Sequence, residues 1–443
     1  MLMKQINWKM IILTAVLYLF TVLPVYADPI TIATIWTSSA FNDDTLVDFS
    51  RSSRRVQMAR QGFEKGLDAV PDAPEMQEIL IEENSDIRKY MTNIAELYEN
   101  EDILMTVGAI SDENTMYASM EMNFFNVPML IPFSDGLAST NMNSSNSVRM
   151  MPSTQKYVNF FNNLFSETLF SFMNTLLFED NLIPDYEFNV VVFFSNNYNG
   201  HNTAVNLTQT IMANGYQINS YVSYESGRLL NTVQKTWYDF PEKMNSTDAV
   251  IIIGEDGDPL NGLSDVYRLW KNNNLYPVFL LVGYIPDMVT SDLAKANNVY
   301  SVQPSLDFSN CPSDIVNRSE ALGYAAGYIT AKTIMEASKV QSKEPSGIRL
   351  WFSNDAKKRE LHQEYITSFR SNIQTNLLKL NEKIPCYGYV NFNLSIDNQI
   401  DLELVHYTSP DKFDVVDANT IIMNQLMEKL TSTYKDYFER KNK

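Results

Sequence analysis

The chain has 443 residues and a formal net charge of −19 at pH 7, because 53 aspartate and glutamate residues outnumber 34 lysine and arginine residues. The phosphate backbone of nucleic acids repels such an excess of negative charge, so we expect no nucleic-acid partner. The length is greater than one hydrophobic core of usual size needs, and it predicts two domains.

The N-terminus has the residue order of a secretory signal peptide. Lys4 and Lys9 precede an apolar run over residues 10–25, and the run stops at Val25-Tyr26-Ala27, which ends on a small residue. A membrane-spanning helix needs roughly 20 apolar residues, and this run is shorter and is interrupted by Pro24. We therefore expect a signal peptide over residues 1–27 that is cleaved after Ala27.

The residue after that cleavage site is Asp28, not cysteine, so the sequence offers no attachment point for a bacterial lipoprotein anchor. No later stretch is apolar enough to span a bilayer, and we expect no direct membrane anchor. The two cysteines, Cys311 and Cys386, could pair in an exported protein. Sequence alone does not place their Cα atoms within bonding reach, so the pairing stays open.

Short apolar runs alternate with helical patterns from Ile30 onward, which is typical of parallel sheets covered by helices. In the first half the predicted strands cover residues 30–36, 78–82, 103–108 and 127–133. Between them, apolar residues recur at helical spacing over 56–70 and 87–97. These elements predict one doubly wound α/β unit.

The pattern restarts after Pro152 with a helical stretch near residues 157–172. The strands predicted next cover residues 188–194, 218–224, 249–254, 278–283 and 299–304, and the helices include 202–213 and 260–272. A second α/β unit of similar build follows.

After Pro304 the rhythm changes to two long helical stretches, at residues 319–338 and 359–378. Strands over 387–393 and 400–407 come next, and these late elements must be shared between the two units. A last helix over about 420–440 has a narrow apolar stripe, which favours a docked C-terminal helix over a partner-binding one.

Six short segments resemble, in chain order, the motifs of one known family. They are Met-Ala-Arg-Gln-Gly-Phe at 58–63, Thr-Val-Gly-Ala-Ile-Ser at 106–111, Val-Pro-Met-Leu-Ile-Pro-Phe-Ser at 127–134, Val-Arg-Met-Met-Pro-Ser at 148–153, Ser-Asn-Asn-Tyr-Asn-Gly at 195–200, and Ala-Leu-Gly-Tyr-Ala-Ala-Gly-Tyr at 321–328. No single segment is specific to the family. Together they occur in the family's order over almost the whole mature chain. The chain resembles the type I periplasmic solute-binding proteins, which include the leucine/isoleucine/valine-binding proteins and related receptor ligand-binding domains.

The resemblance implies an α/β fold of two doubly wound parallel-sheet lobes, joined by three crossing strands that form a hinge, with a ligand cleft between them. We expect lobe 1 over residues 28–152 and about 305–398, lobe 2 over 153–304 and about 399–417, and the C-terminal helix over 418–443. In doubly wound sheets ligands bind beyond the carboxyl ends of the strands, so the candidate residues come directly after each strand.

In the first lobe, Ser38 follows the first strand, and its hydroxyl suits a polar ligand. In the family, a serine at the position of Ser111, with nearby backbone N–H groups, holds the carboxylate of an amino acid. Here Asp112 follows it, and a carboxylate facing the cleft would repel that ligand, although acidic residues also cap helix N-termini routinely. Ser134 and Asp135 follow the fourth strand and are further candidates.

In the second lobe, Tyr198 resembles an aromatic residue of the family's opening turn. The branched-chain amino-acid binders keep an acidic residue for the ligand's ammonium where this chain has Tyr284. Glu255 and Asp256, after the strand 249–254, could substitute for it, although solvated loop carboxylates are the simpler interpretation. With Asp112 and Asp135, these acidic residues favour a ligand that bears a positive charge.

The chain lacks the common patterns of catalytic chemistry. His201, His362 and His406 have no metal-ligand spacing, and neither cysteine is near a histidine in sequence. Nucleophile-elbow, phosphate-loop and dinucleotide patterns are missing. We expect no enzymatic activity, no metal and no cofactor.

Three functions remain open. The leading hypothesis is a free periplasmic protein that captures a small polar molecule, such as an amino acid, an amide or an amine, and delivers it to an ABC-type permease. A sensor module that reports ligand to a membrane signalling partner is the alternative. A hydrolase built on the same lobes is the third.

Overall fold

A computed structural model describes residues 29–36, 50–83, 86–100, 102–134, 146–152, 154–166, 188–225, 227–254, 260–282, 291–341, 354–392, 400–409 and 412–416. The predicted signal peptide over 1–27 and the predicted C-terminal helix lie outside these residues. Within them, none of the helices is both long enough and apolar enough to cross a membrane.

The first lobe is built on a sheet of five parallel strands in the order β2-β1-β3-β4-β5. Its strands are β1 (Ile30–Trp36), β2 (Met76–Glu82), β3 (Met105–Val107), β4 (Met129–Ile131) and β5 (Ser147–Arg149). Helices α2 (Ser50–Asp68), α3 (Ile87–Asn100) and α4 (Asp112–Phe125) connect them. The first four strands were predicted, whereas β5 was not, because only one of its three residues, Val148, is apolar.

The second lobe is built on a sheet of seven strands in the order β14-β13-β10-β9-β8-β6-β7. Its parallel strands are β6 (Asn189–Ser195), β7 (Gln217–Tyr224), β8 (Ala249–Ile253), β9 (Val278–Val282) and β10 (Val299–Pro304), and β13 (Leu402–Ser409) and β14 (Lys412–Val416) add an antiparallel edge. Its helices are α6 (Thr154–Ser166), α8 (Tyr198–Ala213), α9 (Leu229–Asp239), α10 (Pro241–Asn245), α11 (Leu260–Asn272) and α12 (Ser291–Ala294).

Both faces of the second sheet are buried at its central strands β6, β8 and β9, which explains why these strands are almost continuously apolar. On β6, Val190, Val192 and Phe194 belong to the core on one face. Val191 and Phe193, which alternate with them, belong to the core on the other face. This alternation follows from the two-residue period of a strand whose two faces are both covered by helices.

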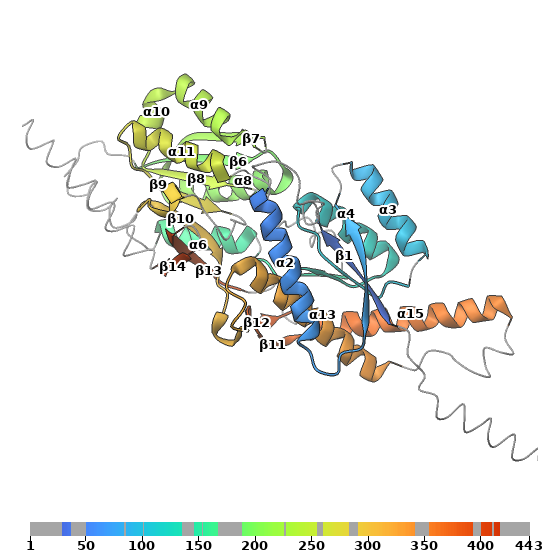
Figure 1. Cartoon of the computed structure of the whole chain (residues 1–443). Coiled ribbons are helices and arrows are strands. Elements are labelled where there is room, and N and C mark those ends of the chain that lie inside the picture. Colours follow the sequence, from blue (N-terminus) through green and yellow to red (C-terminus); the bar gives the residue numbers. More distant parts are fainter. Residues whose placement is uncertain are drawn as a thin grey trace, which may run out of the picture.

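The late elements are divided between the lobes (Figure 1). Helices α13 (Arg318–Val340) and α15 (Asp355–Leu378) and the hairpin of β11 (Asn381–Ile384) and β12 (Gly388–Asn391) share the core of the first lobe. Strands β13 and β14 pair at the edge of the second sheet, beside β10. The chain therefore passes between the lobes three times: after β5, after β10 and between β12 and β13.

Helices α2 and α13 lie side by side in the first lobe and approach at backbone contact (Figure 1). A Cβ atom added to Gly62 would overlap the backbone oxygen of Glu320, and one added to Gly323 would overlap that of Ala59. Gly66 and Gly327 meet the opposite backbone in the same way one turn later. Only glycine, which has no Cβ, allows this approach.

The three crossings are hydrogen bonded to one another. The hydroxyl of Tyr387 donates to the backbone oxygen of Met150, in the first crossing. The backbone N–H of Asp307, in the second crossing, donates to the backbone oxygen of Tyr387 at 3.2 Å. Next to it, the N–H of Ser305 donates to the backbone oxygen of Asp401, in the third crossing, at 2.8 Å.

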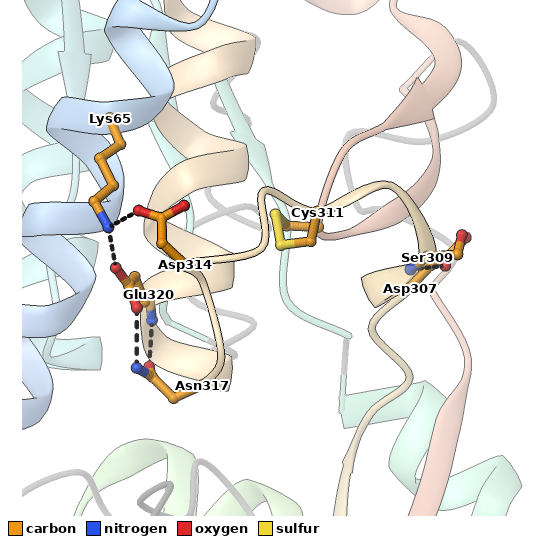
Figure 2. Close-up of a disulfide and its surroundings, with 8 residues drawn as sticks. Lys65, Asp307, Ser309, Cys311, Asp314, Asn317 and Glu320 are labelled. Atoms are coloured by element: carbon orange, nitrogen blue, oxygen red, sulfur yellow. Dashed lines mark hydrogen bonds and ion pairs between the residues drawn. A yellow bond between two sulfur atoms is a disulfide. The ribbon is translucent and has the colours of Figure 1, made fainter.

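A disulfide between Cys311 and Cys386 strengthens this junction (Figure 2). The pairing that the sequence left open is therefore made, with the two Cα atoms 4.5 Å apart. Cys386 is completely buried, and it precedes Tyr387 in the turn between β11 and β12. The disulfide thus holds the second crossing against the hairpin that leads to the third.

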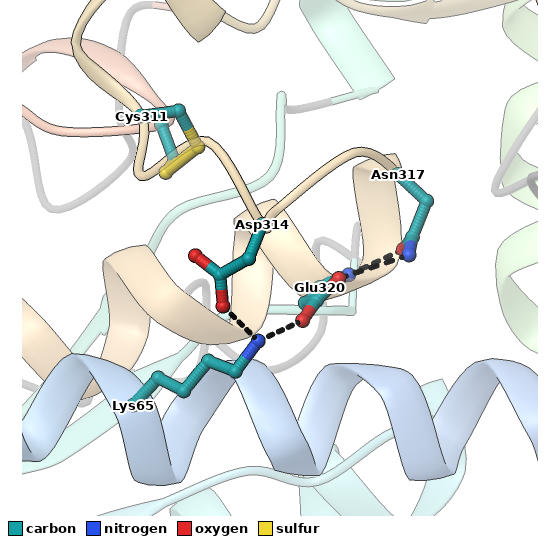
Figure 3. Close-up of polar contacts among 6 residues, drawn as sticks. Lys65, Cys311, Asp314, Asn317 and Glu320 are labelled. Atoms are coloured by element: carbon teal, nitrogen blue, oxygen red, sulfur yellow. Dashed lines mark hydrogen bonds and ion pairs between the residues drawn. A yellow bond between two sulfur atoms is a disulfide. The ribbon is translucent and has the colours of Figure 1, made fainter.

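Helix α2 is joined to the segment that leads into α13 by a lysine. The ammonium of Lys65 lies 2.7 Å from a carboxylate oxygen of Asp314 and 2.7 Å from one of Glu320 (Figure 3). Asn317 caps α13 by accepting a hydrogen bond from the N–H of Glu320. These contacts bind the N-terminus of α13 to both helix α2 and the second crossing.

Candidate functional site

The carboxyl ends of two strands lie where the chain changes lobe. The first crossing leaves the carboxyl end of β5, and the second leaves the carboxyl end of β10. Because neighbouring strands in both sheets run parallel, the carboxyl ends of the other parallel strands share the same edges. Loops that follow such edges are where α/β proteins bind ligands. The candidate site therefore comprises the residues that directly follow these strands.

In the first lobe a carboxylate fills the start of α4. Glu83 follows β2, and its Oε1 accepts hydrogen bonds from the backbone N–H groups of Ile110 at 2.7 Å and Ser111 at 2.9 Å. The backbone N–H of Glu83 donates to the backbone oxygen of Trp36, the last residue of β1. Glu83 is 9% exposed, so this negative charge is almost wholly removed from solvent.

The charge of Glu83 also affects the pKa of the buried phenol of Tyr90. Tyr90 is fully buried on α3, and its hydroxyl has no hydrogen-bond partner among the described residues. Burial raises the pKa of Tyr90 well above its usual value, and the neighbouring Glu83 carboxylate raises it further. Tyr90 is therefore protonated throughout the physiological range of pH.

Ser111 is the N-cap residue of α4. Its Oγ accepts hydrogen bonds from the backbone N–H of Asn114 at 3.3 Å and from Asn114 Nδ2 at 2.9 Å. Oxygen-bearing side chains cap helices in this way because the first N–H groups of a helix lack partners in the helix itself. The other amide atom of Asn114, Oδ1, is buried and has no partner in the described structure.

Two further residues complete this edge. Ser134 follows β4, and its side chain is 1% exposed. Trp36, at the end of β1, packs its indole ring against Phe63 and Phe133, at centroid distances of 6.1 Å and 5.7 Å. The indole N–H of Trp36 is buried without a hydrogen-bond partner among the described residues.

In the second lobe, polar side chains form a chain after β6 and β7. Asn196 donates from Nδ2 to Glu225 Oε1 at 2.7 Å, and its Oδ1 lies 2.9 Å from Nε2 of His201. The imidazole of His201 packs edge to face on Phe194, with 4.8 Å between ring centroids. These groups are solvent exposed and offer both donors and acceptors.

The first turn of α8 in this lobe is capped from within. Asn197 Oδ1 accepts from the N–H of Gly200 at 2.6 Å. The hydroxyl of Ser195 lies under the same turn, buried and without a partner in the described chain. A side chain at Gly200 would overlap Ser195, so glycine is required for this packing.

The structure tests the location of only some predicted site residues. Ser111 and Ser134 both lie at the carboxyl edge of the first sheet, after neighbouring strands. Asp112 and Tyr198 are the first residues of α4 and α8, and the structure describes their backbones only. The remaining predicted residues, Ser38, Asp135, Glu255, Asp256 and Tyr284, lie outside the described residues.

Sequence reasoning missed three residues of the two edges: Glu83, Asn196 and Glu225. Glu83 and Glu225 directly follow predicted strands and Asn196 is the second residue after one, so the rule that selected the other candidates could have selected them. The contact of Glu83 with Ser111 depends on the order of the strands in the sheet, which the sequence pattern does not show.

The histidines do not assemble into a site. His201 contacts Asn196, whereas His362 pairs with Asp102 at 2.6 Å and His406 lies 3.2 Å from the backbone oxygen of Ala296. Within the described ranges, no group of three histidine, cysteine, aspartate or glutamate residues could hold a metal ion.

No protein-family model matches the sequence, and no curated protein matches it. Solved structures do match the fold. A leucine-binding protein from Thermotoga maritima is 14% identical, with a TM-score of 0.61, and the match covers 88% of this chain and 98% of that one. A possible leucine/isoleucine/valine-binding protein from Rhodopirellula baltica is also 14% identical, with a TM-score of 0.59 over 88% of this chain and 97% of that one.

A solute-binding protein of an ABC transporter from R. palustris, in complex with benzoate, has a TM-score of 0.59 at 8% identity. That match covers 88% of this chain and 96% of the other. All three therefore share the architecture over nearly their whole length although few of their residues are identical to those of this chain. The chain has the two-lobed α/β fold of the type I periplasmic solute-binding proteins, as its motifs predicted.

Proposed function

We propose that the protein is an extracytoplasmic solute-binding protein that closes its two lobes over one small polar molecule. The observation that carries the proposal is the shared fold, since it extends over 96% or more of the chains of a leucine-binding protein and of a benzoate-bound solute-binding protein. Polar side chains at the carboxyl ends of strands in both lobes support it, because ligands of α/β proteins bind there.

The proposed ligand contacts come from both lobes. On the first lobe they are Ser38, Ser111, Asp112, Ser134 and Asp135, and on the second lobe they are Tyr198, Glu255, Asp256 and Tyr284. Closure over the ligand would bring the two sets together in a cleft. The hydrogen-bonded crossings at Met150, Asp307 and Asp401 support a hinge at the junction of the lobes.

The protein is proposed to act in the periplasm, after cleavage of a signal peptide at Ala27, and to deliver its ligand to an ABC-type permease. We propose that it binds its ligand without converting it chemically. The sequence has no nucleophile-elbow, phosphate-loop or dinucleotide motif, and its histidines have no metal-ligand spacing. A signalling partner in place of the permease is the alternative, and the two predict different membrane complexes. Co-purification of the ligand-loaded protein with its membrane partner distinguishes a permease from a kinase or cyclase.

A thermal-shift screen of the protein spanning residues 28–443 tests the binding function. The probes are leucine, isoleucine, benzoate, and panels of amides, amines, nucleosides and sugars. A ligand that binds only the folded state adds about 2.7 kcal/mol of stability at a concentration of 100 times its Kd. Small-angle X-ray scattering then measures whether the same ligand makes the protein more compact.

Alanine variants connect binding to the proposed site. Ser111→Ala and Ser134→Ala are expected to weaken binding of the hit compound about tenfold each, which is the effect of one lost hydrogen bond to a polar ligand. Ser371→Ala, at an exposed position of α15, serves as the matched control. A screen with no stabilising compound, or a hit that both serine variants bind as wild type does, would contradict the proposal.

A further inference from the structure

The start of α4 is a place where a protein of this fold could bind an anion. Backbone N–H groups at a helix N-terminus point outward with partial positive charge, and they bind carboxylates, sulfates and phosphates. Helix α4 has 14 residues and follows β3 at the carboxyl edge of the first sheet. A free N-terminus here would therefore attract a ligand carboxylate.

The turn that leads into this helix is already occupied. Glu83 Oε1 accepts from both Ile110 N and Ser111 N, the two amides that precede the helix. Ser111 Oγ is occupied by the amide and backbone nitrogens of Asn114. The protein thus supplies its own carboxylate at the point where an anionic ligand would bind, and a second anion beside it would meet a buried negative charge of the same sign.

Besides the Tyr90 hydroxyl, two buried polar side-chain atoms on the elements around this turn have no partner in the described structure, and both are uncharged. Asn114 Oδ1 and Trp36 Nε1 are both buried, in side chains that are 8% and 2% exposed, and neither has a hydrogen-bond partner in the described structure. A buried polar atom costs free energy until it finds a partner, so a bound group that can hydrogen bond would stabilise this edge.

The buried cation of this sheet lies elsewhere. Arg149 is completely buried on β5, at the outer edge of the sheet, and it makes interactions of its own within the chain. Strands β3 and β5 are separated by β4, so Arg149 is about 10 Å along the sheet from the strand that leads into α4. Arg149 thus lies on a strand that is not adjacent to the one leading to the amides that Glu83 occupies.

We propose that Glu83 determines which ligands this lobe accepts: by filling the amides of Ile110 and Ser111, it rejects a ligand carboxylate and leaves this edge to an uncharged or positively charged group. The proposal rests on the proposed solute-binding function and narrows its ligand class to amides, amines and other solutes that present no carboxylate here. Glu83 is thus a specificity-determining residue.

The test compares probes that differ only in the carboxylate. Wild-type protein labelled with ¹⁵N-isoleucine and ¹⁵N-serine is titrated with formate, with benzoate against benzamide, and with leucine against leucinamide, at matched ionic strength. The amide resonances of Ile110 and Ser111 report occupancy of the α4 N-terminus directly. In wild type, formate, benzoate and leucine are expected to leave both resonances unmoved.

In Glu83→Ala, the vacated amides are expected to bind formate, with saturable shifts of the Ile110 and Ser111 resonances and an affinity about tenfold or more above that of wild type. Formate is also expected to raise the melting temperature of this variant more than that of wild type. Glu82→Ala is the matched control, because it removes the same charge from the adjacent, exposed residue. Glu83→Gln keeps the side-chain shape if the alanine variant fails to fold, and it is expected to show the same gain in a weaker form.

Saturable shifts of Ile110 and Ser111 in wild type with benzoate or leucine, at affinities equal to those of the Glu83 variants, would overturn the proposal. Equal formate binding by Glu82→Ala and Glu83→Ala would overturn it as well. These outcomes are separate from failure of the solute-binding function, which would appear as a screen without any stabilising compound while the formate titration of Glu83→Ala still reports on the amides.

Discussion

The guanidinium of Arg318 forms an ion pair with the carboxylate of Glu403, and this contact joins the first turn of α13 to β13, and so one lobe to the other. The same guanidinium donates to the backbone oxygen of Pro304 and lies 4.5 Å from the ring centroid of Phe413 on β14. Arg318 is 6% exposed. The junction of the lobes therefore contains a buried cation held by several partners.

Replacing that cation is expected to destabilise the protein strongly. In Arg318→Ala, the carboxylate of Glu403 stays partly buried without its partner, and breaking such a pair costs about 3–5 kcal/mol. Urea denaturation monitored by circular dichroism measures the loss. Arg268→Ala, which breaks exposed pairs with Asp265 and Asp292, is the control and is expected to change stability little. Equal losses in the two variants would refute this account of Arg318.

The glycines between α2 and α13 predict a second effect. In Gly323→Ala the new methyl group would overlap the backbone of Ala59, so the helices must separate, and we expect a loss of about 3 kcal/mol. Gly262→Ala, on α11, has open space around the new methyl group and is expected to stabilise the protein by about 0.5 kcal/mol. The two variants differ only in what surrounds the methyl group. Opposite changes in melting temperature support the prediction, and a neutral Gly323→Ala contradicts it.

The disulfide predicts a third effect. Cys311 and Cys386 are separated by 75 residues, and closing a loop of this length lowers the entropy of the unfolded chain by the equivalent of about 4 kcal/mol. The double variant Cys311→Ala/Cys386→Ala is expected to lose about that much stability, with no further loss on addition of dithiothreitol. Wild type is expected to fall to the level of the variant when dithiothreitol is added. A double variant as stable as oxidised wild type would contradict the prediction.

An ion pair beside the disulfide predicts a dependence on pH. The ammonium of Lys383, 2.6 Å from Asp307, and the hydrogen bonds from Ser309 hold the pKa of the Asp307 carboxyl well below its usual range. Because the folded pKa is depressed, this carboxylate stabilises the fold above the unfolded value of about 3.9 and loses that effect as pH falls below it.

Asp307→Asn is therefore expected to be less stable than wild type at neutral pH and to approach it as the pH falls from about 4 to about 2. Denaturation midpoints across this range provide the measurement. Asp239→Asn, at an exposed position of α9, is the control. A gap between wild type and Asp307→Asn that stays constant down to the lowest pH would show that the ion pair is not its cause.

Much of the fold was predictable because its strands are buried on both faces. Apolar runs located β1 and β10, and apolar residues at helical spacing located α11, with the bounds that the structure gives them. The strands that were missed have few apolar residues or are exposed: β5 has one apolar residue among its three, and three of the five residues of β14 are exposed at the edge of the second sheet. Such segments bury too little apolar surface to leave a pattern in the sequence.

The site was predictable only in part, because it depends on which strands are neighbours. The rule that ligands bind after strands selected Ser111 and Ser134, and both lie at the carboxyl edge of the first sheet. It did not reveal that β1 lies between β2 and β3, which is what brings Glu83 within hydrogen-bonding distance of Ser111. A contact between residues 28 positions apart requires the strand order, which no local pattern contains.

The glycine contact between α2 and α13 also determines the order in which the chain can fold during synthesis. The contact of Gly62 with α13 cannot form until the segment that contains Gly323 has been synthesised. Closing so long a loop is slow and entropically costly. Strands β6 to β10 follow one another without interruption by the first lobe, so they can pair while α13 is still being made. Strands β1 to β5 can pair earlier still, but the face of their sheet that packs against α13 is completed only after the whole of β6 to β10 has been synthesised.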